Sequence, residues 1–205
     1  MLDTTTNLYV QQLADFIVSK RFDPVTQKTP YYHMGATITD AVLQAGLNYN
    51  YVVYPRVLKI LKEYPNFTST CDFIILMQTI PLSEIINWNN KRKLELIEQL
   101  CWFFYKNGVE NENQLAKWLD NEFNVKELLK INGVGPKTID YLKMLSGLQA
   151  IAIDRHLFEF LRLAGIFIDT YEEASELYQK TARYLSISNY ELDKKIWLYM
   201  SKQKV

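Results

Sequence analysis

Residues 128–138 read Leu128-Leu129-Lys130-Ile131-Asn132-Gly133-Val134-Gly135-Pro136-Lys137-Thr138, which predicts a helix, a tight glycine turn and a second helix. Gly133 and Gly135 can adopt backbone angles that other residues avoid, and they let a ligand approach the main chain closely. Val134 is expected to fill the apolar gap between the two helices. Because the first N–H groups of a helix have no partner within it, the start of the second helix is a ready phosphate site.

The turn differs from two other phosphate-binding motifs. The Gly-x-x-x-x-Gly-Lys spacing of a P-loop is absent, and the third glycine of a dinucleotide-binding fingerprint does not follow. Two alternatives therefore stay open for the turn alone. It can be a purely structural connection, or it can belong to a module that binds DNA without cutting it.

The rest of the chain predicts an all-α fold. Glycine and proline are scarce, with seven and six residues, and long stretches show helical rather than alternating periodicity. Thr37 or Thr39 is expected to cap a helix that runs to Leu47. Tyr51–Glu63 is expected to form the next helix, with Pro55 tolerated in its first turn.

The composition limits the function classes. Of the 205 residues, 48% are hydrophobic and 22% are charged, which is typical of a globular protein. Lys and Arg together number 23, as do Asp and Glu, so any nucleic-acid-binding surface must be a confined patch. The two cysteines cannot form a disulfide framework or supply the four thiolates of an iron–sulfur cluster. The chain shows no signal-peptide pattern and no apolar run of membrane-spanning length, so we expect a cytoplasmic protein.

Two segments together resemble a known family. In Ile131–Lys137, an apolar residue precedes Gly-Val-Gly, one further residue and a lysine. In Ala150-Ile151-Ala152-Ile153-Asp154-Arg155-His156, an apolar run ends in an aspartate. This pair is similar to the endonuclease III superfamily of helix-hairpin-helix DNA glycosylases. The Asp-Arg-His continuation resembles the archaeal-type 8-oxoguanine DNA glycosylases, as does the ending with Glu191-Leu192-Asp193, Ile196-Trp197 and Lys202 to Lys204.

The resemblance implies two helical lobes with a cleft between them. A six-helix barrel would span residues 35–146 and contain the helix-hairpin-helix at 125–146, while residues 1–34 plus 147–205 would form the second lobe. The protein would act as a monomer on damaged double-stranded DNA, removing an oxidised base such as 8-oxoguanine. No iron–sulfur cluster, other cofactor or metal site is expected, except that the hairpin carbonyls can hold a monovalent cation.

The resemblance also implies the catalytic pair. In lyase members a lysine amine attacks the sugar C1′, displaces the base and forms a Schiff base, and β-elimination then cuts the strand. The matching residue is Lys137, where a helix N-terminus and partial burial would favour the neutral amine. The matching carboxylate is Asp154, which would stabilise the cationic sugar as the base leaves. Taken alone, Asp154 is more typical of a helix N-cap, and both roles can coexist.

Further residues are expected to contact DNA. The hairpin would hold a phosphate without reading sequence, and the residues after the catalytic aspartate would add contacts. Base flipping leaves a gap in the duplex, which a side chain from the turn Leu47–Tyr51 would fill. The DNA-contact candidates are Gly133, Val134, Gly135, Thr138, Arg155 and His156, with Asn48 or Tyr49 in the gap.

Two alternatives to a lyase remain. The chain can be a non-catalytic helix-hairpin-helix protein that binds DNA. Lys137 can be a phosphate ligand in a monofunctional glycosylase, which releases the base without cutting the strand. The basic run Lys91-Arg92-Lys93 is expected to be a solvated helix face rather than a DNA contact. His33, remote from both motifs, is expected to be incidental.

Overall fold

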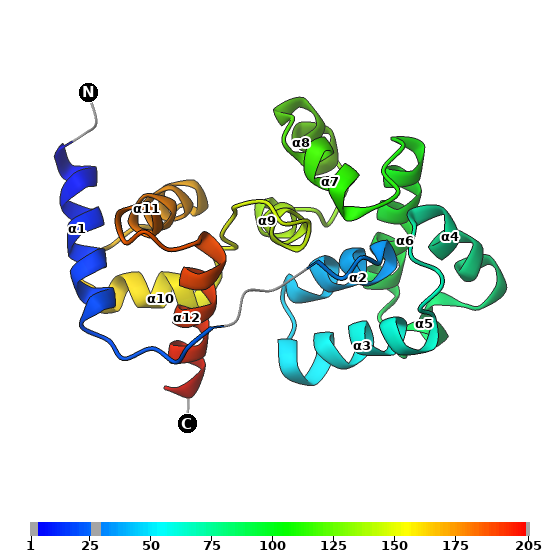
Figure 1. Ribbon diagram of the computed structural model, residues 1–205, viewed down its shortest axis with the longest axis horizontal. Helices are drawn as coiled ribbons and strands as arrows, with labels where there is room; N and C mark the ends of the chain where they lie inside the picture. The colour runs from blue at the N-terminus through cyan, green and yellow to red at the C-terminus, as the bar shows by residue number, and fades with distance from the viewer. Residues whose placement is uncertain (1–3, 26–29, 204–205) are drawn as a thin grey trace. The chain divides into compact units, whose positions relative to one another are not determined.

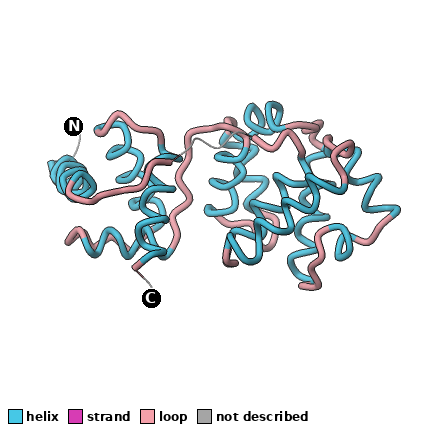
Figure 2. Tube along the Cα trace, turned by 60° about the horizontal axis from the view of Figure 1, so that its bottom comes forward, coloured by secondary structure: helices cyan, strands magenta, loops and turns pink. Residues whose placement is uncertain are grey.

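The computed structural model describes residues 4–25 and 30–203, and the chain divides into two units. One unit comprises residues 1–28 and 149–205, and the other comprises residues 29–148. Residues 1–3, 26–29, 204 and 205, which the predicted lobes and tail include, lie outside the described part. Throughout the described ranges the regular elements are helices joined by loops (Figure 2).

The unit of residues 29–148 is built around one central helix. Its elements are α2 (Met34–Gln44), a π-helix (Tyr49–Val53), α3 (Tyr54–Glu63), α4 (Thr70–Thr79), α5 (Leu82–Ile85), α6 (Lys91–Lys106), α7 (Glu112–Leu119), α8 (Glu122–Leu129) and α9 (Pro136–Leu145). Every residue from Met34 to Leu43 is buried, and α2 packs against α3, α4, α6 and α9 (Figure 1). A helix with so few charged residues is expected at the centre of a core.

The start of α2 differs from the prediction. His33 caps the helix, because its Nδ1 accepts a hydrogen bond from the Ala36 N–H at 3.3 Å, and its Nε2 bonds the Tyr64 carbonyl at 3.1 Å. The buried Glu112 carboxylate accepts from the His33 N–H at 2.8 Å and from the Thr37 hydroxyl at 2.7 Å. The predicted cap at Thr37 or Thr39 is therefore wrong, because both lie inside α2, and so is the interpretation of His33 as incidental.

Two local features explain how the helices around α2 pack. A Cβ atom on Gly35 would lie 2.2 Å from Cδ2 of Phe73, so the glycine is what lets the α4 ring approach α2. The predicted helix Tyr51–Glu63 is divided, since the π-helix ends at Val53 and α3 begins at Tyr54. Pro55 lies in the first turn of α3, as predicted.

The second unit contains α1 (Thr4–Val18), α10 (Arg155–Leu163), α11 (Tyr171–Tyr184) and α12 (Asn189–Lys202). α1 packs against α11, and α12 packs against both α10 and α11. Phe160 and Tyr178 are fully buried in its core. The Gln12 side chain donates to the Ala164 carbonyl at 2.7 Å and so joins α1 to the end of α10. In the described ranges, no helix is long and apolar enough to cross a bilayer.

Candidate active site

The glycine turn connects α8 to α9. Ile131 and Val134 are buried in the core of the 29–148 unit, and the Val134 N–H donates to the Ile131 carbonyl at 3.0 Å. Val134 thus fills the space between the helices, as expected. Gly133 has a φ of +96°, and a Cβ there would lie 3.1 Å from Cδ2 of Leu96 on α6. The backbone conformation and this neighbour both favour glycine at position 133.

Gly135 is different. Its φ is −122° and its ψ is 177°, which is extended backbone that any residue adopts, so the expectation of an unusual angle at this position is wrong. No atom lies within 4 Å of the place where its Cβ would be. Within the described chain, neither the Gly133 N–H nor the Gly135 N–H donates to a protein group. The fold itself therefore gives no reason for glycine at 135, whereas an external ligand approaching the main chain would.

Lys137 lies in the first turn of α9. It is half-buried, and its Nζ is 5.7 Å from the centroid of the Tyr141 ring on the same helix. The positive end of the helix dipole disfavours an ammonium at this position. Thr138, the next residue, is buried, and its N–H donates to the Gly135 carbonyl at 3.0 Å.

The basic run at the start of α6 is only partly a solvated face. Lys91 and Arg92 are exposed, as predicted. For Lys93 the prediction is wrong, because its Nζ donates to the Val42 carbonyl at 2.6 Å and to the Ala45 carbonyl at 3.1 Å. Burial lowers the pKa of Lys93, and the charges of Arg92 and Lys137 lower it further.

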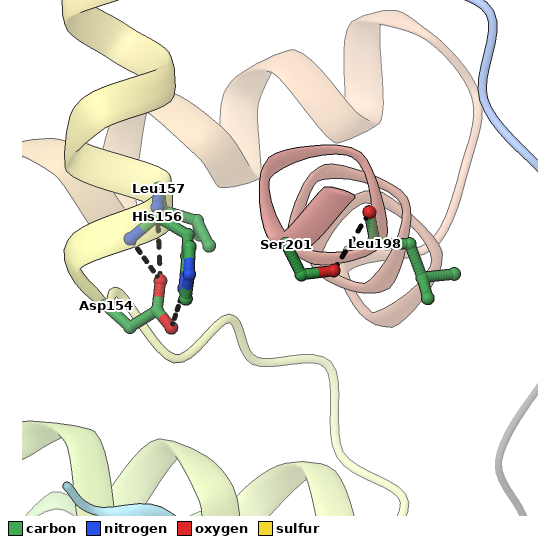
Figure 3. Close-up of polar contacts among 5 residues, drawn as sticks. All are labelled: Asp154, His156, Leu157, Leu198 and Ser201. Carbon is green, nitrogen blue, oxygen red and sulfur yellow. Dashed lines mark hydrogen bonds and ion pairs between the residues drawn. The ribbon is translucent and has the colours of Figure 1, made fainter. Parts of the chain in front are cut away.

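Asp154 is the N-cap of α10, as the structural interpretation predicted. Its Oδ1 accepts from the N–H groups of His156 at 2.8 Å and Leu157 at 3.1 Å, and its Oδ2 lies 3.1 Å from His156 Nδ1 (Figure 3). Only 12% of the Asp154 side chain is exposed. A carboxylate with three such neighbours is held in one orientation and remains partly accessible.

The residues around Asp154 form a well-packed setting. The His156 ring contacts the Trp197 ring edge-to-face at 6.4 Å between centroids. The Tyr178 hydroxyl donates to the Leu157 carbonyl at 2.7 Å. Burial raises the pKa of Tyr178 well above its usual value, and the charges of Asp193 and Asp154 add to this effect. Arg155, by contrast, is exposed at the start of α10.

The turn after α2 holds the remaining candidates. Asn48 is exposed and caps the π-helix, its side chain accepting from the Tyr51 N–H at 3.0 Å. Tyr49 packs against the core, with its ring 6.0 Å from that of Tyr54. Tyr51, which is not among the predicted DNA contacts, is 82% exposed. Tyr49 and Tyr51 differ in burial. The sequence did not reveal this difference, because α-helical spacing does not predict which residues of a π-helix are buried.

The candidates thus fall into two groups. The hairpin, Lys137 and the Leu47–Tyr51 turn belong to the 29–148 unit, and Asp154, Arg155 and His156 belong to the other. The approach of Lys137 to Asp154 stays a prediction. Among the described residues, no group of three or more His, Cys, Asp or Glu side chains could hold a metal ion.

Comparisons with known proteins identify the fold. The crystal structure of the 3-methyladenine DNA glycosylase (MagIII) of H. pylori, bound to 1,N6-ethenoadenine, is similar to this chain with a TM-score of 0.61 and 16% sequence identity. The similarity covers 98% of each chain, so the predicted all-helical DNA glycosylase fold is confirmed. A family model described as a domain of unknown function (DUF8548) matches residues 86–201. No curated protein sequence matches the chain.

Proposed function

This chain belongs to the DUF8548 family, and we propose that it is a base-excision repair enzyme, a DNA glycosylase with AP-lyase activity. The observation that carries the proposal is the hairpin. Two amide N–H groups without a partner in the described chain, at Gly133 and Gly135, precede a half-buried lysine in the first turn of α9. Such a turn can hold a DNA phosphate by its main chain and present the lysine amine beside it.

Lys137 is the proposed nucleophile. Its neutral Nζ attacks the C1′ carbon of the damaged nucleotide, and the glycosidic C1′–N bond breaks, so that the base leaves with the electron pair and takes up a proton. The nitrogen then loses one proton, the C1′–O4′ bond breaks with O4′ taking up a proton, and a protonated Schiff base forms. Removal of a C2′ proton then breaks the bond to the 3′ oxygen, and water finally releases the enzyme.

Asp154 is the proposed electrostatic partner. Its carboxylate stabilises the positive charge that develops on the sugar as the base leaves. The hydrogen bonds from the His156 and Leu157 N–H groups fix this carboxylate in advance, so little reorganisation is needed during the reaction. The proposal requires Lys137 and Asp154 to reach the same deoxyribose.

The proposed substrate is damaged duplex DNA bound by a monomer, and the leading lesion is an oxidised purine such as 8-oxoguanine. The Asp154-Arg155-His156 continuation supports this choice by resemblance. The similar structure, an H. pylori 3-methyladenine DNA glycosylase bound to 1,N6-ethenoadenine, supports a second candidate lesion, an alkylated or etheno-modified adenine. A monofunctional glycosylase is the second candidate reaction. In that case Lys137 would hold a phosphate rather than attack the sugar.

A lesion panel tests the proposal. Duplexes with one 8-oxoguanine, one 1,N6-ethenoadenine or one abasic site are incubated with wild type, Lys137→Ala, Asp154→Asn and the control Lys143→Ala, which changes a lysine in the last turn of the same helix. We expect wild type and Lys143→Ala to release 8-oxoguanine and nick the strand, and both other variants to lose nicking. Base release that survives Lys137→Ala would favour the monofunctional alternative, and no release from any lesion would contradict the enzyme.

A further inference from the structure

The π-helix that precedes α3 has a wider turn than the helices around it. The Val53 N–H donates to the Asn48 carbonyl at 3.2 Å, and the Tyr54 N–H donates to the Tyr49 carbonyl. Both bonds join residues five apart in the sequence, whereas the bonds of an α-helix join residues four apart. Turns of this kind are rare and often lie at functional sites, so the support of this one matters.

Pro55 explains why the wider turn forms at this place. The helical path continues from the π-helix into α3 without a break, and Pro55 lies just beyond the join. A proline in such a path has no N–H to donate, and its ring clashes with the carbonyl of the residue four before it. That residue is Tyr51. A wider turn relieves the clash but leaves the segment with fewer α-helical hydrogen bonds.

Arg56 supports the π-helix from outside its own backbone. Its Nη1 donates to the Val52 carbonyl at 2.6 Å, and its guanidinium carbon lies 4.3 Å from the centroid of the Trp88 ring. Trp88 packs against the core of the 29–148 unit, and its N–H donates to the Ser83 carbonyl at 3.0 Å. A flat guanidinium stacked on an aromatic ring is held in one orientation. Arg56 therefore ties the π-helix to a segment that is distant in the sequence.

The same region of α3 has a second tie to that segment. Lys59 lies one helical turn beyond Arg56, and its Nζ donates to the Glu84 carbonyl at 3.1 Å. Residues three apart in a helix share a face, so both ties come from one side of α3. The end of the π-helix is thus fixed to α3, and this part of α3 is fixed to the segment that contains Glu84 and Trp88.

Tyr51 is the side chain that this arrangement presents to solvent. It is 82% exposed, although Tyr49 packs against the core and Val53 is fully buried. Tyr51 immediately precedes Val52, whose carbonyl Arg56 holds. If the π turn collapsed to an α turn, one residue would leave the turn, and Tyr51 would rotate by about 100° relative to α3. The direction of the Tyr51 ring therefore depends on the contact from Arg56.

The chemistry of this turn suits a nucleic acid. Exposed aromatic rings are surfaces on which bases stack. Residues 41–62 contain no Asp or Glu, so the segment carries no side chain that would repel phosphates.

We propose that Arg56 is a positioning residue, which fixes the π-helix so that the Tyr51 ring enters the DNA stack as the damaged base is extruded. This inference rests on the proposed function. Extrusion of a base costs unstacking and unpairing, and a ring that is already held in the required direction adds little further cost of ordering. Arg56 acts through Tyr51 and touches neither the sugar nor the base.

The test measures base extrusion directly, without relying on catalysis. Duplexes carry one paired 8-oxoguanine or 1,N6-ethenoadenine next to a 2-aminopurine, whose fluorescence rises when the neighbouring base leaves the stack. A second duplex carries an abasic-site analogue, which binds without extrusion of a base. The variants are Arg56→Met, Tyr51→Ala and the double variant. Lys62→Met is the matched control, because it removes the same charge from an exposed position on α3.

We expect the equilibrium constant for extrusion to fall about tenfold in Arg56→Met and in Tyr51→Ala, as when a base loses its aromatic partner. The double variant should be no weaker than Tyr51→Ala, because two residues that act through one contact are not additive. Lys62→Met should match wild type, and every variant should bind the abasic-site duplex as wild type does.

Thermal unfolding gives an assay temperature at which each variant is folded. If Arg56→Met is unfolded at every usable temperature, Arg56→Lys takes its place in the same comparison. This variant keeps a donor for the Val52 carbonyl but loses the flat stack on Trp88. We expect it to show the same lack of additivity with Tyr51→Ala.

The remaining outcomes separate this inference from the proposed function. Unchanged extrusion in the Arg56 variant, or losses that multiply in the double variant, would overturn the positioning role, because Arg56 would then act independently of Tyr51. Wild type that binds either lesion duplex with no rise in fluorescence would overturn it as well. Wild type that extrudes a base but releases none would remove the proposed glycosylase and support the positioning role.

Discussion

Oδ2 of Asp154 lies 3.1 Å from Nδ1 of His156, while Oδ1 of the same carboxylate accepts hydrogen bonds from the first backbone N–H groups of α10. Asp154 is a helix cap that stabilises the fold. Under the proposed function the same carboxylate also stabilises the charge on the sugar. Asp154→Asn can separate the cap from the charge, because the asparagine side-chain oxygen still accepts hydrogen bonds but carries no negative charge.

We expect the free energy of unfolding of Asp154→Asn to lie within about 1 kcal/mol of that of wild type, since asparagine is a good N-cap. Asp154→Ala should lose about 2 kcal/mol, because the cap disappears and the nearly buried His156 ring loses its partner. Urea unfolding measures both. Base release should be lost in both variants, whereas Ser188→Ala, which removes the N-cap of α12, should lower stability alone. Full base release by Asp154→Asn would show that the charge has no catalytic role.

The two glycines of the hairpin should respond differently to alanine. Gly133→Ala should destabilise the fold by more than about 1 kcal/mol, because position 133 has a positive φ and Leu96 lies close by. Gly135→Ala should be as stable as wild type or about 0.5 kcal/mol more stable, because its backbone angles suit alanine and its Cβ meets open space.

DNA binding gives a second test of Gly135. Fluorescence anisotropy with a duplex carrying an abasic-site analogue should show weaker binding by the stable variant Gly135→Ala, since its methyl group would keep a phosphate away from the amides. Unchanged affinity in that variant would remove the hairpin from the DNA interface.

The tyrosines of the π-helix turn give a third prediction. Tyr49→Ala should cost about 2 kcal/mol of stability, because its ring packs on the core, while Tyr51→Ala should change stability by less than about 0.5 kcal/mol. We expect Tyr51→Ala to reduce base release from paired duplex and to leave trapping on an abasic site unaffected. If Tyr51→Ala releases the base normally, Asn48 remains the residue to test.

His33 predicts a pH dependence of stability. Burial lowers the pKa of His33 below its usual value of 6.5. The unfolded chain therefore binds the proton more readily than the folded one, and stability rises with pH up to about 6.5 and is lost below it. His33→Asn keeps a good N-cap but does not titrate. Its unfolding free energy should vary less between about pH 5 and pH 7 than that of wild type. If the unfolding free energies of both proteins changed equally with pH, His33 would not be the group responsible.

The sequence predicted the elements better than the contacts. Helical periodicity and the Gly-Val-Gly turn were sufficient for the all-helical fold and for the hairpin between α8 and α9. Asp154 was identified as an N-cap because residue type and position both favour that role. These features depend on residues that are close together in the sequence, so a sequence pattern is enough to predict them.

Features that depend on distant partners were missed. At the start of α2, Glu112, which is far along the chain, accepts hydrogen bonds from the His33 N–H and the Thr37 hydroxyl. Lys93 is partly buried because its ammonium group donates a hydrogen bond to the Val42 carbonyl near the end of α2. Its neighbours Lys91 and Arg92 are exposed. No periodicity within a single helix gives these tertiary contacts.

The most direct test of the central claim is to locate the covalent bond. Wild-type protein is trapped with borohydride on a duplex with one abasic site, digested, and mapped by mass spectrometry. The account predicts that the sugar is attached to Nζ of Lys137 and to no other lysine. A stable adduct on a different residue, or no adduct under conditions in which the protein binds the duplex, would contradict it.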